Sequence, residues 1–98
     1  MPSQFTLVET DKFKADLSYV QKLKVDPKAL QDVLAGVRWA LSTNPLAHSP
    51  LPGTPDIRVR KTVRVDRGTA SIPMLRVLFK VDGNTVQLLS LDTLDLIL

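Results

Sequence analysis

The alternation of apolar and polar residues predicts a strand and two helices in the first half of the chain. Residues 5–10 (FTLVET) are rich in β-branched and aromatic side chains, which is typical of a short strand. A helix is expected to start after a Thr10 or Asp11 cap and to end near residue 24 or 25. The apolar residues that predict it at helical spacing are Phe13, Leu17, Val20 and Leu23.

A second helix is predicted between Asp26 and Asn44. Asp26 suits the capping position, Pro27 suits the first helical position, and the Asn44-Pro45 pair ends the helix. One face carries the apolar residues Leu30, Val33, Leu34, Val37 and Leu41. Trp39 lies off this stripe, so we expect it either to pack under a neighbouring loop or to anchor a partner.

Strands are predicted at 57–65, 72–81 and 85–92, after an ordered, proline-rich loop at 44–56. Asp82-Gly83 is typical of the turn of a hairpin. The alternation predicts an inner set that faces the helices, formed by Val59, Val63, Leu75, Val77 and Phe79. The predicted outer set is basic and comprises Arg58, Arg60, Arg64, Arg76 and Lys80. Lys61 falls on the apolar side, which indicates a position near a strand edge.

These elements predict an α+β fold with the order β-α-α-β-β-β. A small, mainly antiparallel β-sheet would be covered on one face by a two-helix hairpin. The 98 residues are enough for one domain and one modest core, so residues 1–98 are expected to form a single domain.

Charge is distributed unevenly along the chain. Residues 1–56 hold six basic and six acidic residues, whereas residues 57–81 hold seven basic residues and only Asp66 as an acid. The basic segment favours a polyanionic partner, and a solvated strand face is the alternative.

Composition limits the chemistry that the chain offers. There is no cysteine and only one histidine, so the sequence predicts neither a metal site nor a cofactor. No Gly-rich phosphate loop is present either. His48 lies in the proline-rich loop, where a general-base role is the alternative, but we expect it to face solvent because no partner lies near it in the sequence. No apolar run is long enough to span a bilayer, and a cytoplasmic location is expected.

Three stretches together resemble the RelE/ParE superfamily of bacterial toxins from type II toxin–antitoxin pairs. They are the helical hairpin that ends at Asn44-Pro45, the loop LPGTPD (51–56), and the segment LRVLFKVDGNTVQLLSLD (75–92). In the last segment, Arg76 and Phe79 occupy the arginine and aromatic positions of the family pattern. The resemblance covers most of the chain.

The resemblance implies a cytoplasmic toxin that a cognate antitoxin neutralises. RelE-like members are ribosome-dependent mRNA endoribonucleases (mRNA interferases) that inhibit translation, whereas ParE-like members inhibit DNA gyrase without chemistry. RNA-cutting members carry basic residues on the second strand, which Arg58 and Arg60 match most nearly, and the third-strand arginine matches Arg76. They also use an arginine and a tyrosine or histidine after the last strand, where this chain continues as TLDLIL (93–98).

RNA cleavage by an internal 2′-hydroxyl needs a base, an acid and positive charge near the phosphate. Arg76 and Lys80 are the predicted catalytic residues, and Asp92 or Asp95 is the alternative base. Phosphate contacts are predicted for Arg58, Arg60, Arg64 and Arg67. An ion pair between Arg76 and one of the aspartates is the competing interpretation.

The sequence leaves three functions open. The protein is a RelE-like enzyme that binds ribosome and mRNA, a ParE-like inhibitor of gyrase, or an inactive relative that acts with its antitoxin as a co-repressor. The apolar residues Leu94, Leu96, Ile97 and Leu98 are expected to pack on the sheet, on the antitoxin, or on a second copy as a homodimer. Membrane binding is not expected.

Overall fold

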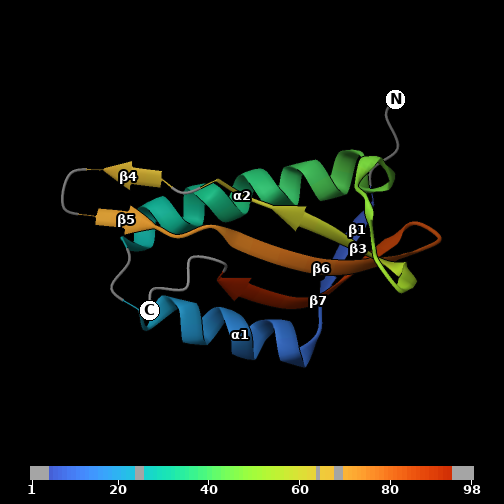
Figure 1. Cartoon of the computed structure of the whole chain (residues 1–98), viewed down its shortest axis with the longest axis horizontal. Helices are drawn as coiled ribbons and strands as arrows, with labels where there is room; N and C mark the ends of the chain where they lie inside the picture. Colours follow the sequence, from blue (N-terminus) through green and yellow to red (C-terminus); the bar gives the residue numbers. More distant parts are fainter. Residues whose placement is uncertain (1–4, 24–25, 64, 68–69, 94–98) are drawn as a thin grey trace.

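The computed structural model describes residues 5–23, 26–63, 65–67 and 70–93. Two helices, α1 (Asp11–Gln21) and α2 (Pro27–Thr43), pack against one face of a five-stranded sheet (Figure 1). The other elements are β1 (Thr6–Glu9), the 3-10 turn η1 (Pro45–Ala47), β2 (Pro50–Leu51), β3 (Thr54–Lys61), β4 (Val65–Arg67), β5 (Ala70–Ile72), β6 (Leu75–Asp82) and β7 (Thr85–Thr93).

The sheet has the strand order β1-β7-β6-β3-β2. β1 runs parallel to β7, and the other neighbours are antiparallel, while β4 and β5 form a separate two-stranded ribbon. This arrangement confirms the predicted α+β fold, in which helices cover one face of a mainly antiparallel sheet.

Both helices begin where the sequence predicts. The Phe13 N–H donates to Thr10 Oγ1, and the Lys28 N–H donates to Asp26 Oδ1, so each helix has a side-chain cap. The hydroxyl of Thr10 also donates to the Leu88 carbonyl of β7 at 2.8 Å, which fixes the start of α1 to the sheet. α2 ends at Thr43 as predicted, whereas α1 ends at Gln21, earlier than expected.

One core joins the helices to the sheet. It contains Phe13 and Val20 of α1, five residues of α2, Ile72 of β5, and the alternate residues of β6 and β7. The buried α2 residues are Ala29, Leu30, Leu34, Val37 and Leu41. The inner sheet residues are Leu75, Val77, Phe79, Val86, Leu88 and Leu91. Trp39 is 68% exposed, so the expectation that it packs under a loop is wrong.

Two predicted strands are divided in the structure. β3 begins at Thr54 and ends at Lys61, and Val63 beyond it is 74% exposed, so the prediction that Val63 is buried is wrong. Pro73 separates β5 from β6, because proline has no N–H with which to continue a ladder. The loop predicted at 44–56 contains η1, β2 and the start of β3.

The β6–β7 hairpin forms the centre of the sheet. Its turn follows Asp82, and Gly83 has a φ of 60°, which glycine adopts without the steric cost that a Cβ would bring. The pairing shifts by one residue between Leu78 and Phe79. This bulge leaves Leu89 without a ladder partner on β6.

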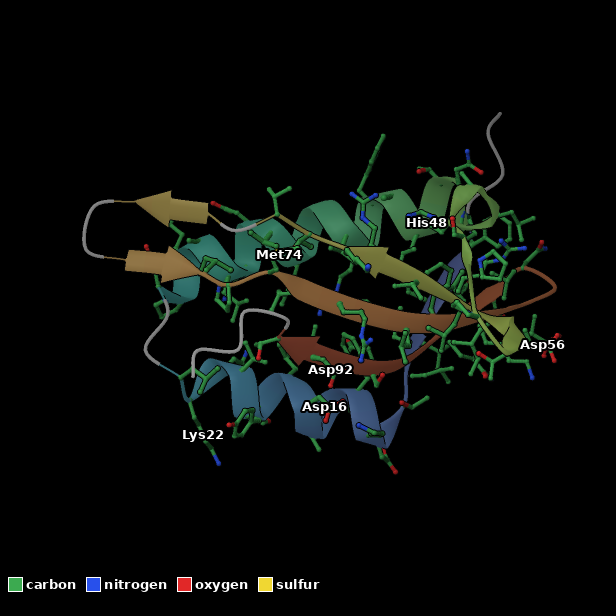
Figure 2. All side chains as sticks on the ribbon, in the orientation of Figure 1. Asp16, Lys22, His48, Asp56, Met74 and Asp92 are labelled. Carbon is green, nitrogen blue, oxygen red and sulfur yellow. The ribbon has the colours of Figure 1, made fainter. Side chains whose placement is uncertain are left out.

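The α1 helix covers the edge of β7 that β1 leaves open. Pairing of β1 with β7 stops at Leu88, and further along β7 the Leu91 N–H donates to Asp16 Oδ2 of α1 at 3.0 Å. Figure 2 shows Asp16 and Asp92 close together where α1 meets β7, and Lys22 pointing away from the sheet. A helix carboxylate therefore replaces the missing strand neighbour.

Candidate nucleic-acid interface

The pairing of β3 with β6 divides the predicted basic face. Residues directly opposite each other on neighbouring strands point to the same side of a sheet. Arg58 lies opposite Phe79 and Arg60 lies opposite Val77, and both of these partners are completely buried in the core under the helices. The prediction that Arg58 and Arg60 lie on the outer face is therefore wrong.

Two cations occupy the helix side of β3 because this strand lies near the edge of the sheet. In the sheet, only the two-residue strand β2 lies beyond β3. The segment around η1 packs beside the helix-side residues of β3. The Arg58 guanidinium donates to the carbonyls of Leu46 and His48 in this segment. Arg58 thus holds the segment between α2 and β2 in place, so its Nη1 group has a structural role.

The opposite, open face of the sheet carries Arg76 and Lys80, as predicted. Lys61 lies opposite Arg76 and Ile57 lies opposite Lys80, so Lys61 joins these cations. Val59 shares this open face too, contrary to the prediction that it points to the helices. Lys80 is exposed and lies on the open face away from the residues of the groove described below.

Arg76 is held in an ion pair. Its Nη2 lies 2.9 Å from Asp92 Oδ2, and the two residues are direct neighbours on β6 and β7. The competing interpretation of Arg76 as one half of an ion pair is therefore confirmed, with Asp92 as its partner. Arg64, Asp95 and the segment 94–98 lie outside the described residues, and so does the side chain of Arg67.

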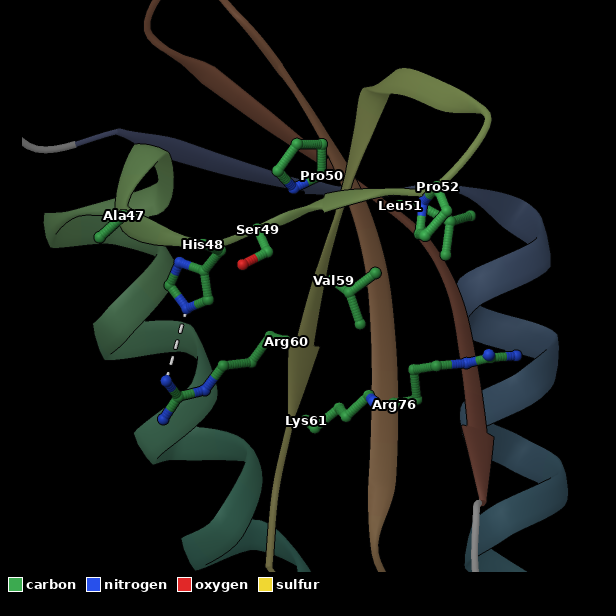
Figure 3. A pocket seen from close by; sticks show the side chains of 10 residues that line it. All are labelled: Ala47, His48, Ser49, Pro50, Leu51, Pro52, Val59, Arg60, Lys61 and Arg76. Carbon is green, nitrogen blue, oxygen red and sulfur yellow. Dashed lines mark hydrogen bonds between the residues drawn. The ribbon is translucent and has the colours of Figure 1, made fainter.

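A groove of about 600 Å³ runs along the edge of β3 (Figure 3). One wall is the segment 47–52, and the other is formed by Val59, Arg60, Lys61 and Arg76. The ladder between β2 and β3 stops at the Pro50–Arg58 pair, and the Val59 N–H donates to the Ser49 carbonyl. Beyond this point the edge of β3 opens into the groove.

Three cationic residues line this groove, and two of them contain unused donors. Arg60 approaches from the helix side, whereas Lys61 and Arg76 come from the open face. Among the described residues, the Nε atoms of Arg60 and Arg76 are buried and make no hydrogen bond. Because these two N–H groups are buried, the groove attracts an anion through the positive charge of the three residues.

His48 lies in the same groove, and the sequence did not predict this position. The residue is half-buried instead of facing solvent, and its ring packs edge-on against Phe79 with centroids 5.4 Å apart. Its Nδ1 lies 3.2 Å from the Pro45 carbonyl, and its Nε2 lies 3.4 Å from Arg60 Nη1. The four prolines of the segment 44–56 indicated an ordered loop, but no pattern linked it to β3.

The groove combines the groups that binding of a phosphodiester requires. Guanidinium and ammonium groups neutralise phosphate charge, and an imidazole accepts or donates a proton near neutral pH. No phenylalanine, tyrosine or tryptophan is part of its lining. Contacts to nucleic acid would therefore be directed mainly to phosphate.

Comparison of the chain with protein-family models, with curated proteins and with solved structures found no match. Within the part of the chain that the structure describes, no group of three or more acidic, histidine or cysteine side chains is arranged to hold a metal ion. Neither described helix has the length and hydropathy needed to cross a bilayer.

Proposed function

We propose that this protein is a RelE-like toxin that binds messenger RNA in the groove along β3 and cleaves it on the ribosome. It would act in the cytoplasm and be neutralised by a cognate antitoxin. The proposal is supported by the order of its elements and by the residues that resemble this superfamily. The observation that carries it is that Arg60, Lys61 and Arg76 all line one open groove, with the Arg76 guanidinium itself directed away from the 47–52 wall toward Asp92 (Figure 3).

The groove suits an RNA strand because its cations come from two neighbouring strands. Lys61 and Arg76 are cross-strand neighbours, so their charges lie side by side on the open face. Arg60 adds a third charge from across the β3 edge. Three cations on successive phosphates would give a salt dependence of log K on log [salt] with a slope of about −2 for a single strand.

Binding is tested first, with a single-stranded 2′-deoxy oligonucleotide that is not cleaved. Each of the variants Arg60→Ala, Lys61→Ala and Arg76→Ala should weaken binding and reduce the salt slope by about 0.7. Lys22→Ala is the matched control, because Lys22 is an exposed cation at the C-cap of α1 and does not line the groove. Equal salt slopes in all four variants would remove the groove as the binding site.

Cleavage is tested in a purified translation system. The wild-type protein should cut message only when ribosomes are present, and the triple groove variant should leave the message intact. Message that is still cut by the triple variant would contradict the proposal, provided that Lys22→Ala cuts normally.

A ParE-like function is the second candidate, and the Arg76–Asp92 ion pair favours it. An arginine that is held by a carboxylate forms part of a fixed binding surface and is less free to brace a reacting phosphate. This candidate predicts that the protein blocks supercoiling by DNA gyrase while message stays intact. Normal supercoiling at saturating protein would exclude it. An inactive co-repressor would leave both reactions unaffected.

A further inference from the structure

We infer that His48 is the general base of the groove and that it accepts the proton of an RNA 2′-hydroxyl. This inference rests on the proposed function, because it assigns the proton-transfer group of the same site. It replaces Lys80 in that role, since Lys80 does not line the groove.

The hydrogen bonds of His48 determine its tautomer. A carbonyl oxygen only accepts, so the contact between His48 Nδ1 and the Pro45 carbonyl places a proton on Nδ1. A guanidinium only donates, so the contact with Arg60 Nη1 requires a lone pair on Nε2. The basic nitrogen of the imidazole is therefore Nε2, the one that faces Arg60 (Figure 3).

One ring contact and two backbone hydrogen bonds fix the position of His48. Edge-on packing against the buried Phe79 ring orients its plane. The Arg58 guanidinium donates to the carbonyl of His48 itself, and the Val59 N–H holds the carbonyl of the next residue, Ser49. A base that is held in place in this way loses little conformational entropy when it adopts its reactive geometry.

Arg60 is placed to act together with His48. Its Nη1 is 3.4 Å from His48 Nε2, a long contact that a substrate hydroxyl can replace. When a phosphate enters the groove, the guanidinium has a stronger acceptor in the phosphate oxygens than in a neutral imidazole. Substrate binding would therefore draw Arg60 toward phosphate and free the lone pair of Nε2.

The reaction then needs only the side chains of the groove and water. His48 Nε2 takes the 2′-hydroxyl proton, the 2′-oxygen forms a bond to phosphorus, and the bond from phosphorus to the 5′-oxygen breaks. The leaving 5′-oxygen takes a proton from water in the groove, and the imidazolium returns its proton to solvent. The products are a 2′,3′-cyclic phosphate and a 5′-hydroxyl, while Arg60, Lys61 and Arg76 stabilise the charge on the phosphate.

The test measures single-turnover cleavage of message on ribosomes by wild-type protein and by His48→Gln. The variant should cleave about 100-fold more slowly or worse, the lower range for loss of a general base. Its affinity for the 2′-deoxy oligonucleotide should stay within about fivefold of the wild-type value, because phosphate charge dominates binding. His48→Ala leaves space for a free imidazole, and added imidazole should restore cleavage.

The possible outcomes distinguish the role of His48 from the proposed function. Cleavage by the wild type that His48→Gln leaves unchanged would overturn the role of His48 and retain the proposed function. Binding without any cleavage by the wild type would overturn both. If His48→Gln melts at a much lower temperature, His48→Ala decides: rescue by imidazole supports the base, and a lack of rescue in folded protein refutes it.

Discussion

Asp16 is expected to stabilise the fold through a backbone contact that no strand supplies. Asp16→Ala removes the acceptor of the Leu91 N–H, and Leu91 is a buried residue with only 3% of its surface exposed. A buried donor left without a partner costs about 1–3 kcal/mol. The exposed Lys12–Asp16 pair adds less than about 0.5 kcal/mol. We therefore expect a loss of about 2 kcal/mol in the free energy of unfolding, or about 10 °C in Tm.

The same contact should make the loss depend on pH. Burial alone would raise the pKa of Asp16, but the hydrogen bond from Leu91, the hydrogen bond from Lys12 and the charge of Lys12 together lower it below its ordinary 3.8. The unfolded chain then binds the proton more readily than the folded one. The stability from ionised Asp16 is therefore complete above the unfolded pKa and is lost as pH falls through the folded value.

Urea denaturation measures this difference at about pH 7 and again at about pH 2.5. The gap between wild type and Asp16→Ala should be wide at neutral pH and narrower in acid. Asp32→Ala is the matched control, because it removes an exposed carboxylate from α2. The role of Asp16 would be refuted if both variants were equally stable at neutral pH, or if the gap stayed the same in acid.

Three further predictions concern the sheet. Asp92→Asn removes the partner of Arg76 in a half-exposed ion pair, so stability should fall by less than about 1 kcal/mol. Affinity for the 2′-deoxy oligonucleotide should rise about two- to fivefold, and weaker binding in a fluorescence titration would contradict the competition for Arg76. Gly83→Ala should cost about 1 kcal/mol in thermal unfolding, because its φ of 60° strains a residue with a Cβ; an unchanged Tm would count against this. Phe79→Ala should cost about 3–5 kcal/mol by chemical denaturation, since the ring is completely buried, and a loss below 1 kcal/mol would be inconsistent with its place in the core.

Local signals in the sequence were enough to predict most of the elements. Thr10 and Asp26 cap the helices as expected, because a capping oxygen needs only the N–H groups two or three residues ahead. Asp82-Gly83 likewise specifies its turn through glycine's access to positive φ. Such features depend on a few consecutive residues, so they are visible without a tertiary structure.

The candidate site was predicted only in part. Arg60 was expected to bind phosphate and Arg76 to act in catalysis from the same outer face, but Arg60 lines the groove from the helix side of the sheet and Arg76 from the open face. His48 was missed because it is brought to Arg60 by the path of the chain through η1 and β2. The periodic pattern of apolar and polar residues does not reveal contacts of this kind, because it describes single helices and strands and not the path of the chain between them.

The sequence by itself determined that β3 has two faces, one with arginines and one with Ile57 and Val59, because side chains alternate along every strand. Only the tertiary structure decided which face meets the helices. A strand in the centre of a sheet must turn its apolar side to the core, but β3 lies near an edge, where guanidinium groups reach loop carbonyls and the groove. The register with β6 therefore places Arg58 and Arg60 on the helix side, next to Phe79 and Val77.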